Sequence, residues 1–283
     1  MKILIIGASG RIGKTVSEIF EKRGYQPFKS YRTERHNYQS EQNWISMDFD
    51  SLTDEEIKDI VIQKQVSHVI FCLPLRYTES VAKALRDLEI RAVFLGSARK
   101  LSRIKDRSVE KVIRAVKLAQ ENCSNWIFIH PTMIYGKQGE NNFNRIARIV
   151  KKFPLIPLPN GGNSLMQPIH ADDVSTALVN ATFIEKSNFE LVLSGPDCLP
   201  YKEIFRKIAE IHQRKILIIN LPVSLLLFLG KLLNIMPFLP SITNQEVRRL
   251  TEDKDFDSQE AYNLLKIDPI TIDQGIKSTF PGT

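Results

Sequence analysis

Three glycines spaced three residues apart follow the first apolar run of this chain and open its first helical pattern. The run is Ile3 to Ile6, the glycines are Gly7, Gly10 and Gly13, and the helical spacing continues to Arg23. In such a loop the first glycine permits a tight turn, the second lets a diphosphate approach the backbone, and the third lets helix and strand pack closely. Free N–H groups at the helix start attract anions. The sequence therefore predicts an α/β fold that binds a dinucleotide near its N-terminus.

Strand-like and helix-like segments alternate along the first half of the chain. Such alternation, with nearly continuous apolar strands, is typical of a parallel sheet covered by helices on both faces. We therefore expect a doubly wound α/β fold with a parallel Rossmann sheet. The expected strands are residues 3–6, 26–31, 45–47, 67–72, 91–96 and 126–130, and the expected helices are residues 12–23, 53–63, 79–88 and 109–121.

The regular alternation stops near residue 136, where glycine, proline and asparagine become frequent. A second, smaller domain that binds substrate is expected to begin there. The predicted division is a dinucleotide-binding core over residues 1–136, to which residues 165–190 return, and a substrate-binding domain over residues 137–164 and 191–283.

The most apolar stretch of the second half is residues 216–230. Asn220, Pro222 and the following Lys231 interrupt it, and a transmembrane helix needs about 20 apolar residues. We expect a core strand and helix here. Peripheral membrane contact through residues 216–239 remains an alternative.

Composition limits the environment of the chain. Its 283 residues include three cysteines, none in a Cys-x-x-Cys pair, which argues against a disulfide framework and favours a reducing cytoplasm. The cysteine spacing also predicts no metal site. The first residues reach Gly7 too soon for a signal peptide.

The 39 basic and 32 acidic residues leave a net charge of +7. Residues 1–40 hold eight basic and three acidic residues, residues 91–117 hold nine and two, and residues 137–152 hold five and one. Two of these segments border the expected cofactor cleft and the third enters the second domain. We attribute the surplus to attraction of a phosphorylated dinucleotide and an anionic small-molecule substrate, and expect no nucleic-acid partner. A homodimer is compatible with the sequence.

Three motifs, in order, resemble the short-chain dehydrogenase/reductase family. The closest resemblance is to its extended and atypical members, such as the NAD-dependent epimerases and dehydratases and the complex I accessory-subunit-like branch. The glycine loop has the family's spacing, residues 130–136 (His-Pro-Thr-Met-Ile-Tyr-Gly) resemble its Arg-Pro-x-x-Val-Tyr-Gly segment, and residues 168–174 resemble its Ile-His-Val-Asp-Asp-Val segment. The resemblance can be followed over residues 1–215. It implies an NAD(P) cofactor contacted by Gly7, Ser9, Gly10, Arg11, Ile12, Gly13, Asp48, Leu73 and Pro131.

The end of the second expected strand bears on the choice between NAD and NADP. NAD-binding folds place a carboxylate there to hold the ribose hydroxyls, whereas NADP-binding folds place arginine to hold the 2′-phosphate. The sequence reads Tyr31-Arg32, with Arg35 close behind. Arg32, Arg35 and Arg11 therefore favour NADP, and Glu34 keeps NAD as an alternative.

The family's catalytic Tyr-x-x-x-Lys helix is missing. The resemblance places Ser97, after the fifth strand, where the family has a substrate-orienting serine. No tyrosine lies between Ser97 and Trp126. Aligned on Glu110, the tyrosine position holds Ser102 and the lysine position holds Asp106. A phenol with a pKa near 10 cannot transfer protons at neutral pH without a neighbouring cation, so this absence affects the expected chemistry directly.

Two interpretations stay open. In the first, the protein is an atypical reductase whose proton donor comes from elsewhere, with Lys105 and Tyr135 as the candidates beside Ser97, and Arg107 and Tyr77 as further ones. In the second, it keeps the cofactor fold without redox chemistry, as complex I accessory-subunit-like members do.

The substrate is expected near residues 160–170, which resemble the segment that folds over the substrate in nucleotide-sugar enzymes. Its candidates are Asn160, Gln167 and His170, together with His130, which stands where the family often has arginine. The alternative to substrate binding is a simple hairpin loop for the segment around Asn160 and a structural role for His170.

The leading hypothesis is an NADP-dependent extended or atypical short-chain oxidoreductase or epimerase acting on a small carbonyl, hydroxyl or nucleotide-sugar substrate. The alternative is a non-redox NAD(P)-binding assembly factor or sensor. The intact glycine loop and Ser97 favour the first, and the missing Tyr-Lys pair favours the second.

Overall fold

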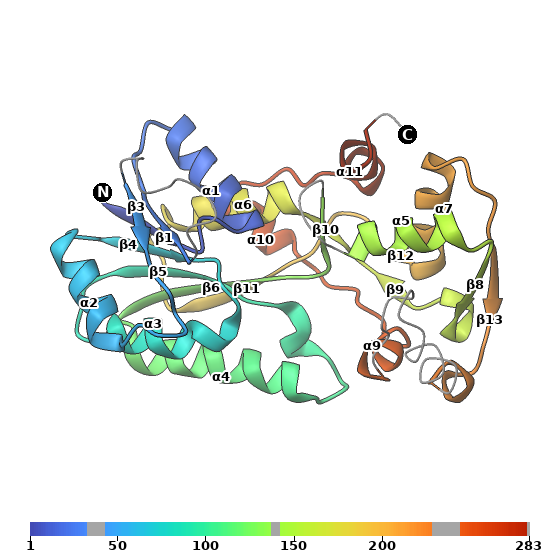
Figure 1. Cartoon of the computed structure of the whole chain (residues 1–283), viewed down its shortest axis with the longest axis horizontal. Helices are drawn as coiled ribbons and strands as arrows, with labels where there is room; N and C mark the ends of the chain where they lie inside the picture. The colour runs from blue at the N-terminus through green and yellow to red at the C-terminus, as the bar shows by residue number, and fades with distance from the viewer. Residues whose placement is uncertain (33–42, 137–141, 228–243, 282–283) are drawn as a thin grey trace.

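The computed structural model describes residues 1–32, 43–136, 142–227 and 244–281 (Figure 1). Seven parallel strands form its main sheet in the order β11-β6-β5-β4-β1-β2-β3. Their bounds are β1 Ile3–Ile6, β2 Phe28–Tyr31, β3 Trp44–Ser46, β4 His68–Phe71, β5 Arg91–Leu95, β6 Asn125–Pro131 and β11 Phe189–Leu193. The doubly wound parallel sheet predicted from the sequence is confirmed.

Helices cover both faces of this sheet, with α1, α6 and α10 on one face and α2, α3 and α4 on the other (Figure 1). Two apolar layers result, because successive strand residues point to opposite faces. Val93 and Phe94 of β5, for example, are both fully buried but belong to different layers. The helices are α1 Arg11–Lys22, α2 Asp54–Gln63, α3 Thr78–Ala84, α4 Arg107–Asn122, α6 Ala171–Ala181 and α10 Gln259–Leu265.

The chain reverses its direction of travel across the sheet between β1 and β4. Crossovers from β1 go toward β2 and β3, and those from β4 go toward β5 and β6. In open α/β sheets a ligand crevice forms at the carboxyl ends of the strands beside such a switch point. The glycine loop follows β1 and therefore lies at this crevice.

Apart from the two layers on the main sheet, a further apolar cluster lies around Tyr135, Phe143 and Ile204, in the part of the chain where the smaller domain is expected. Its strands pair only in twos. Its elements are β7 Ile134–Tyr135, α5 Asn142–Lys152, β8 Leu155–Leu158, β9 Leu165–Met166, β10 Ile169–His170, β12 Leu199–Pro200, α7 Tyr201–Ile211, β13 Leu217–Asn220, α9 Asn244–Arg249 and α11 Ile272–Thr279.

The chain passes between the two clusters more often than the expected domain division implies. Strand β11 continues to Leu193, so the expected boundary after residue 190 falls inside a strand of the main sheet. Helix α10 packs on the first domain through Ala261 and Leu265, whereas α11 packs on the second through Ile276. In the expected core strand and helix at residues 216–230, the structure has strand β13 up to Asn220 and helical residues 223–227. Leu217 and Leu225 are exposed, so a core position is wrong for them, and residues 228–230 lie outside the described part. No helix in the described residues is both long and apolar enough to cross a membrane.

Candidate functional site

The glycine loop adopts the conformation that its spacing predicts. Gly7 has φ +86°, a region that favours glycine, and its N–H donates to Ser30 Oγ at 2.8 Å. The Gly10 N–H donates to the Gly7 carbonyl at 3.0 Å. A Cβ atom on Gly13 would lie 2.1 Å from the Gly7 carbonyl oxygen, so only glycine allows this close approach of α1 to the loop.

The start of α1 is open to an anion. Gly10 is the N-cap residue, it is exposed, and no side chain caps the helix or places an acid in its first turn. The first N–H groups of a helix need an acceptor, and the helix dipole favours a negative one. Ser9 is exposed beside them, Arg11 is half-buried, and Ile12 is buried. These residues fit the diphosphate of a dinucleotide.

Beyond the loop, Arg32 follows β2 and the acidic residues Asp48 and Asp50 follow β3. Arg32 forms an ion pair with Asp50 at 3.4 Å, and both side chains are more than half exposed. Asp50 also accepts a hydrogen bond from Tyr77 at 2.7 Å. Asp48 accepts from the Asp50 N–H at 3.1 Å. Arg32 therefore already has a carboxylate partner that no sequence pattern indicates; Arg35 lies outside the described residues.

Two further cofactor candidates lie at the same edge of the sheet. Leu73, just after β4, comes within van der Waals reach of Gly7, since a Cβ atom there would lie 2.9 Å from Leu73 Cδ2. Pro131 ends β6 opposite Leu193 and is buried.

Ser97 follows β5 at the same edge and is tied to His130. Its N–H donates to His130 Nδ1 at 3.1 Å, and its hydroxyl accepts from the Arg99 N–H at 3.3 Å. Because Nδ1 accepts a hydrogen bond, the proton of neutral His130 is assigned to Nε2, which lies 2.7 Å from Glu190. Lys100 pairs with the same carboxylate.

Burial sets the charge states in this cluster. Burial lowers the pKa of His130, so the ring is neutral at pH 7, although Glu190 opposes the shift. Burial also opposes the charge on Glu190, but the bonds from Lys100 and His130 outweigh it and hold the pKa of Glu190 below its ordinary value. His130 is 2% exposed and its ring stacks on Phe128. His130 therefore holds the Ser97 turn in place, and both of its ring nitrogens already form hydrogen bonds within the protein.

Ser102 and Asp106, the positions aligned with the missing catalytic pair, both contact a segment that lies far away in the chain. The Ser102 hydroxyl donates to Glu252 at 2.8 Å, and the Arg103 N–H donates to the other oxygen of the same carboxylate. Arg249 donates to Asp106 at 3.0 Å, and the two side chains are 14% and 5% exposed. Residues 249 and 252 therefore contact both positions that the alignment on Glu110 would assign to the family's tyrosine and lysine.

Asp106 has two roles in this arrangement. Besides its contact with Arg249, it caps α4 by accepting hydrogen bonds from the N–H groups of Ser108 and Val109. The Ser108 hydroxyl and these N–H groups, together with Arg249, lower the pKa of Asp106 against the opposing effect of burial. Asp106 is therefore ionised at neutral pH.

The structure does not bring the other catalytic candidates to Ser97 through any contact among the described residues. The Lys105 ammonium donates to the Ser102 carbonyl at 3.1 Å. Tyr135 is fully buried in the second domain, stacked on Phe143, with its hydroxyl 3.5 Å from the Thr271 carbonyl. Burial raises the pKa of Tyr135, the opposite of what a general acid–base tyrosine needs. This placement argues for a packing role for Tyr135.

The candidate substrate residues are held by internal contacts. The Gln167 amide donates to the Gly195 carbonyl at 2.9 Å and accepts from the Phe256 N–H at 2.8 Å. His170 caps α6 by accepting from the Asp172 N–H at 3.3 Å. Asn160 is exposed and has φ 51°, in a turn that continues β8 and leads back to the end of β13. His170 and Gln167 thus serve the fold, and among these three only Asn160 presents an exposed side chain.

Asp173, next to the α6 cap, connects the first domain to the C-terminal segment. It is 5% exposed and accepts from the Ile270 N–H at 3.0 Å. Burial raises the pKa of Asp173 to about 6, with Asp172 and Asp268 adding to the shift.

This shift predicts a pH dependence of stability. Between pH 4 and 6 the folded chain binds more protons at Asp173 than the unfolded chain, so stability falls as pH rises through this range, by about 1–2 kcal/mol from this group. Asp173→Asn keeps an acceptor for Ile270 and is expected to remove this fall and to raise stability at pH 7 by a similar amount. Urea unfolding at pH 4 to 7.5 tests it. Equal slopes for the variant and the wild type would contradict it.

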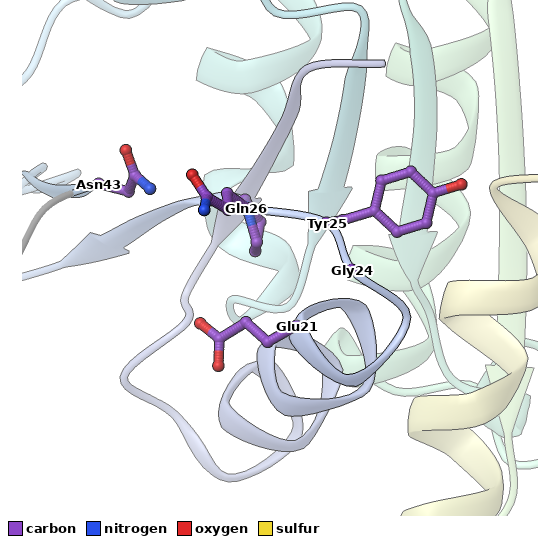
Figure 2. A pocket seen from close by; sticks show the side chains of 6 residues that line it. Glu21, Gly24, Tyr25, Gln26 and Asn43 are labelled. Atoms are coloured by element: carbon purple, nitrogen blue, oxygen red, sulfur yellow. The ribbon is translucent and has the colours of Figure 1, made fainter.

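The structure has one cavity away from this site and a smaller one beside it. One of about 390 Å³ is lined by residues from the α1–β2 turn and by Asn43. In Figure 2 the Tyr25 ring points away from the Gln26 and Asn43 amides. This cavity adjoins the amino end of β2, at the opposite edge of the sheet from the glycine loop. A smaller one of about 170 Å³ lies between Ala98, Leu101, His130 and Glu190, beside the Ser97 turn. The described residues contain no cluster suited to a metal ion.

Sequence reasoning missed Ser30, Asp50, Glu190, Arg249 and Glu252. Each acts on a residue far away in the chain: Glu190 lies 60 positions from His130, and Arg249 lies 143 from Asp106. One signal was available in the sequence. The alignment on Glu110 puts an acid, Asp106, at the position of the family's lysine, and such an acid needs a basic partner.

Comparison with known proteins identifies the fold. No protein-family model matches the sequence. MoeE5 in complex with UDP-glucuronic acid and NAD has a TM-score of 0.74 at 15% identity, covering 98% of this chain and 97% of that chain. UDP-glucose 4-epimerase from Thermotoga maritima, with UDP-glucose, has a TM-score of 0.70 at 14% identity, covering 99% and 97%. UDP-glucose 4-epimerase from Thermus thermophilus, in complex with NAD, has a TM-score of 0.69 at 14% identity, covering 99% and 97%.

These neighbours define the class of fold. The chain has the fold of the extended short-chain dehydrogenase/reductases, in the form of the NAD-dependent epimerases, over nearly its whole length. The resemblance inferred from the three sequence motifs is confirmed at the level of the fold.

Proposed function

We propose that this chain binds a nicotinamide dinucleotide along the glycine loop and acts as an NADP-dependent oxidoreductase or epimerase. The observation that carries the proposal is the uncapped start of α1 at Gly10, next to Gly7 and Gly13, at the same edge of the sheet as Ser97. When bound, the nicotinamide supplies hydride transfer. Ser97 would orient the substrate oxygen, and the nucleotide-sugar class is supported by the UDP-sugars bound in the neighbouring structures.

The preference for NADP rests on Arg32. Its guanidinium suits forked contacts to a 2′-phosphate, but it would have to exchange Asp50 for that phosphate. We therefore propose NADP as the preferred cofactor and NAD as the second one. The ion pair with Asp50 reduces the preference of Arg32 for the 2′-phosphate.

Two substitutions test this assignment. Arg32→Ala is expected to weaken NADPH binding about tenfold and to leave NADH binding nearly unchanged, since only NADPH carries the 2′-phosphate. Asp50→Asn removes the competing charge and is expected to strengthen NADPH binding. Fluorescence titration with both nucleotides measures both effects. Tighter binding of NADH than NADPH by the wild type would overturn the NADP assignment.

The second candidate function is dinucleotide binding without redox chemistry, as in an assembly factor or sensor. The specific observation in its favour is that Ser102 donates a hydrogen bond to Glu252 and that Asp106 forms an ion pair with Arg249. NADPH absorbance followed against a panel of carbonyl compounds and UDP-sugars separates the candidates. Turnover that Ser97→Ala reduces supports the enzyme, and tight binding without turnover across the panel supports the second candidate.

The setting proposed for the protein is the reducing cytoplasm. Cys72, Cys123 and Cys198 are all free thiols. Burial raises the pKa of Cys72 to about 12, which keeps this thiol, close to the cofactor edge, unreactive.

A further inference from the structure

The ribbon formed by β8 and β13 is apolar on both faces. Its strands read Leu-Ile-Pro-Leu and Leu-Ile-Ile-Asn, and they pair in parallel with Leu217 opposite Leu155 and Ile219 opposite Pro157. These four residues share one face, because side chains alternate along a strand. A strand with one solvated face normally alternates apolar with polar residues. The face that carries these four residues, the outer face of the ribbon, therefore has the apolar composition of a buried surface.

In the described part of the chain this outer face is open. Leu155 is 48% exposed and Leu217 is 62% exposed, the largest value for a large hydrophobic residue there. Leu225, shortly after β13, is 42% exposed. The inner face is different, since Ile156 and Leu158 are buried against α5 and α7. The ribbon lies at the end of the long axis opposite to β1 (Figure 1).

Basic residues lie at the amino end of this ribbon, because its two strands are parallel and basic residues precede both of them. Lys151 and Lys152 precede β8, and Arg214 and Lys215 precede β13. All four are exposed, and none forms an ion pair with another described residue. The sequence from residue 141 to 171 and from 211 to 245 contains no aspartate or glutamate. An exposed apolar face is thus bordered by uncompensated positive charge.

We propose that this ribbon face docks on an anionic lipid bilayer. Exposed leucines can enter the headgroup boundary, and lysine and arginine at the adjoining end of the ribbon are attracted to anionic headgroups. The same charges disfavour a second copy of this chain, because two such faces in contact would bring their basic borders together. The contact is peripheral and independent of the dinucleotide site.

Vesicle co-sedimentation tests the proposal. The full chain is expected to bind vesicles of phosphatidylcholine with one-third phosphatidylglycerol, to bind pure phosphatidylcholine vesicles at least about tenfold less, and to be released by high salt. Equal binding to both vesicle types, or no binding to either, would overturn the proposal.

Matched variants locate the surface. Leu155→Ser with Leu217→Ser is expected to lower binding at least about tenfold, and Arg214→Gln with Lys215→Gln by a similar factor. The control is Ile62→Ser with Ile113→Ser, two residues of comparable exposure, 52% and 46%, on α2 and α4 of the first domain. Circular dichroism melts check folding.

Two outcomes count against the ribbon. If the control pair lowers vesicle binding as much as the ribbon pair, the surface has been misplaced. If light scattering shows a dimer that only the ribbon variant dissociates, while vesicles do not bind, the face joins two copies of the chain and the lipid proposal fails.

Discussion

Replacing Gly10 with valine is expected to reduce NADPH binding at least about a hundredfold while the protein remains folded. Gly10 is exposed at the start of α1, and its φ of −81° and ψ of 167° are open to any residue. The isopropyl group would stand where the diphosphate must approach the helix N-terminus. Gly10→Ala should give an intermediate loss. NADPH titration measures the loss, and retained affinity in the valine variant would refute the placement of the cofactor.

Gly13 provides the contrast within the same loop. A Cβ atom there would lie 2.1 Å from the Gly7 carbonyl oxygen and 2.8 Å from Ala8 Cα, both backbone atoms that cannot rotate away. Gly13→Ala is therefore expected to lower stability by about 3 kcal/mol or more, along with binding. Urea unfolding of the two variants separates a blocked site from a damaged fold.

The second large effect is expected at the ion pair between Arg249 and Asp106. Arg249→Ala leaves a carboxylate that is 5% exposed without its basic partner, and breaking a buried pair costs about 3–5 kcal/mol. Because Asp106 keeps its N–H donors at the start of α4, we expect about 3 kcal/mol, the low end of this range. Urea unfolding at pH 7 measures this loss.

An exposed arginine pair serves as the control. Arg206 pairs with Glu203 at 2.6 Å, but their side chains are 56% and 34% exposed. Arg206→Ala should therefore cost less than about 1 kcal/mol. If both arginine variants lost the same stability, the contact between Arg249 and Asp106 would not hold the C-terminal segment against the first domain.

Much of the half of the chain that forms the main sheet was predictable because its signals are local. The run Ile3 to Ile6, the glycine spacing and the helical pattern after Gly13 each depend on neighbouring residues, and together they define β1, the loop and α1. The expected helix at 79–88 ends early, at Ala84. A turn with Asp87 at φ +63° follows it, and the apolar spacing contains no sign of such a turn.

The site was harder to predict because its contacts join distant segments. The place of Ser97 follows from its position after a strand, yet the hydrogen bond of His130 Nε2 depends on Glu190, which reaches it only through the pairing of β6 with β11. Tyr135 and Gln167 look like functional residues in a motif. The structure shows their polar atoms satisfied inside the protein, and tertiary packing of this kind leaves no periodic pattern in the sequence.

The return of α10 to the first domain affects how the chain can fold during synthesis. Leu265 is fully buried against that domain, and Ser258 binds both the N–H of Ser194 and the carbonyl of Val192 at the edge of the main sheet. The core around the main sheet is therefore incomplete until residues 258–265 have left the ribosome. A nascent chain stalled before residue 258 should remain more open to protease at β11 than the released protein.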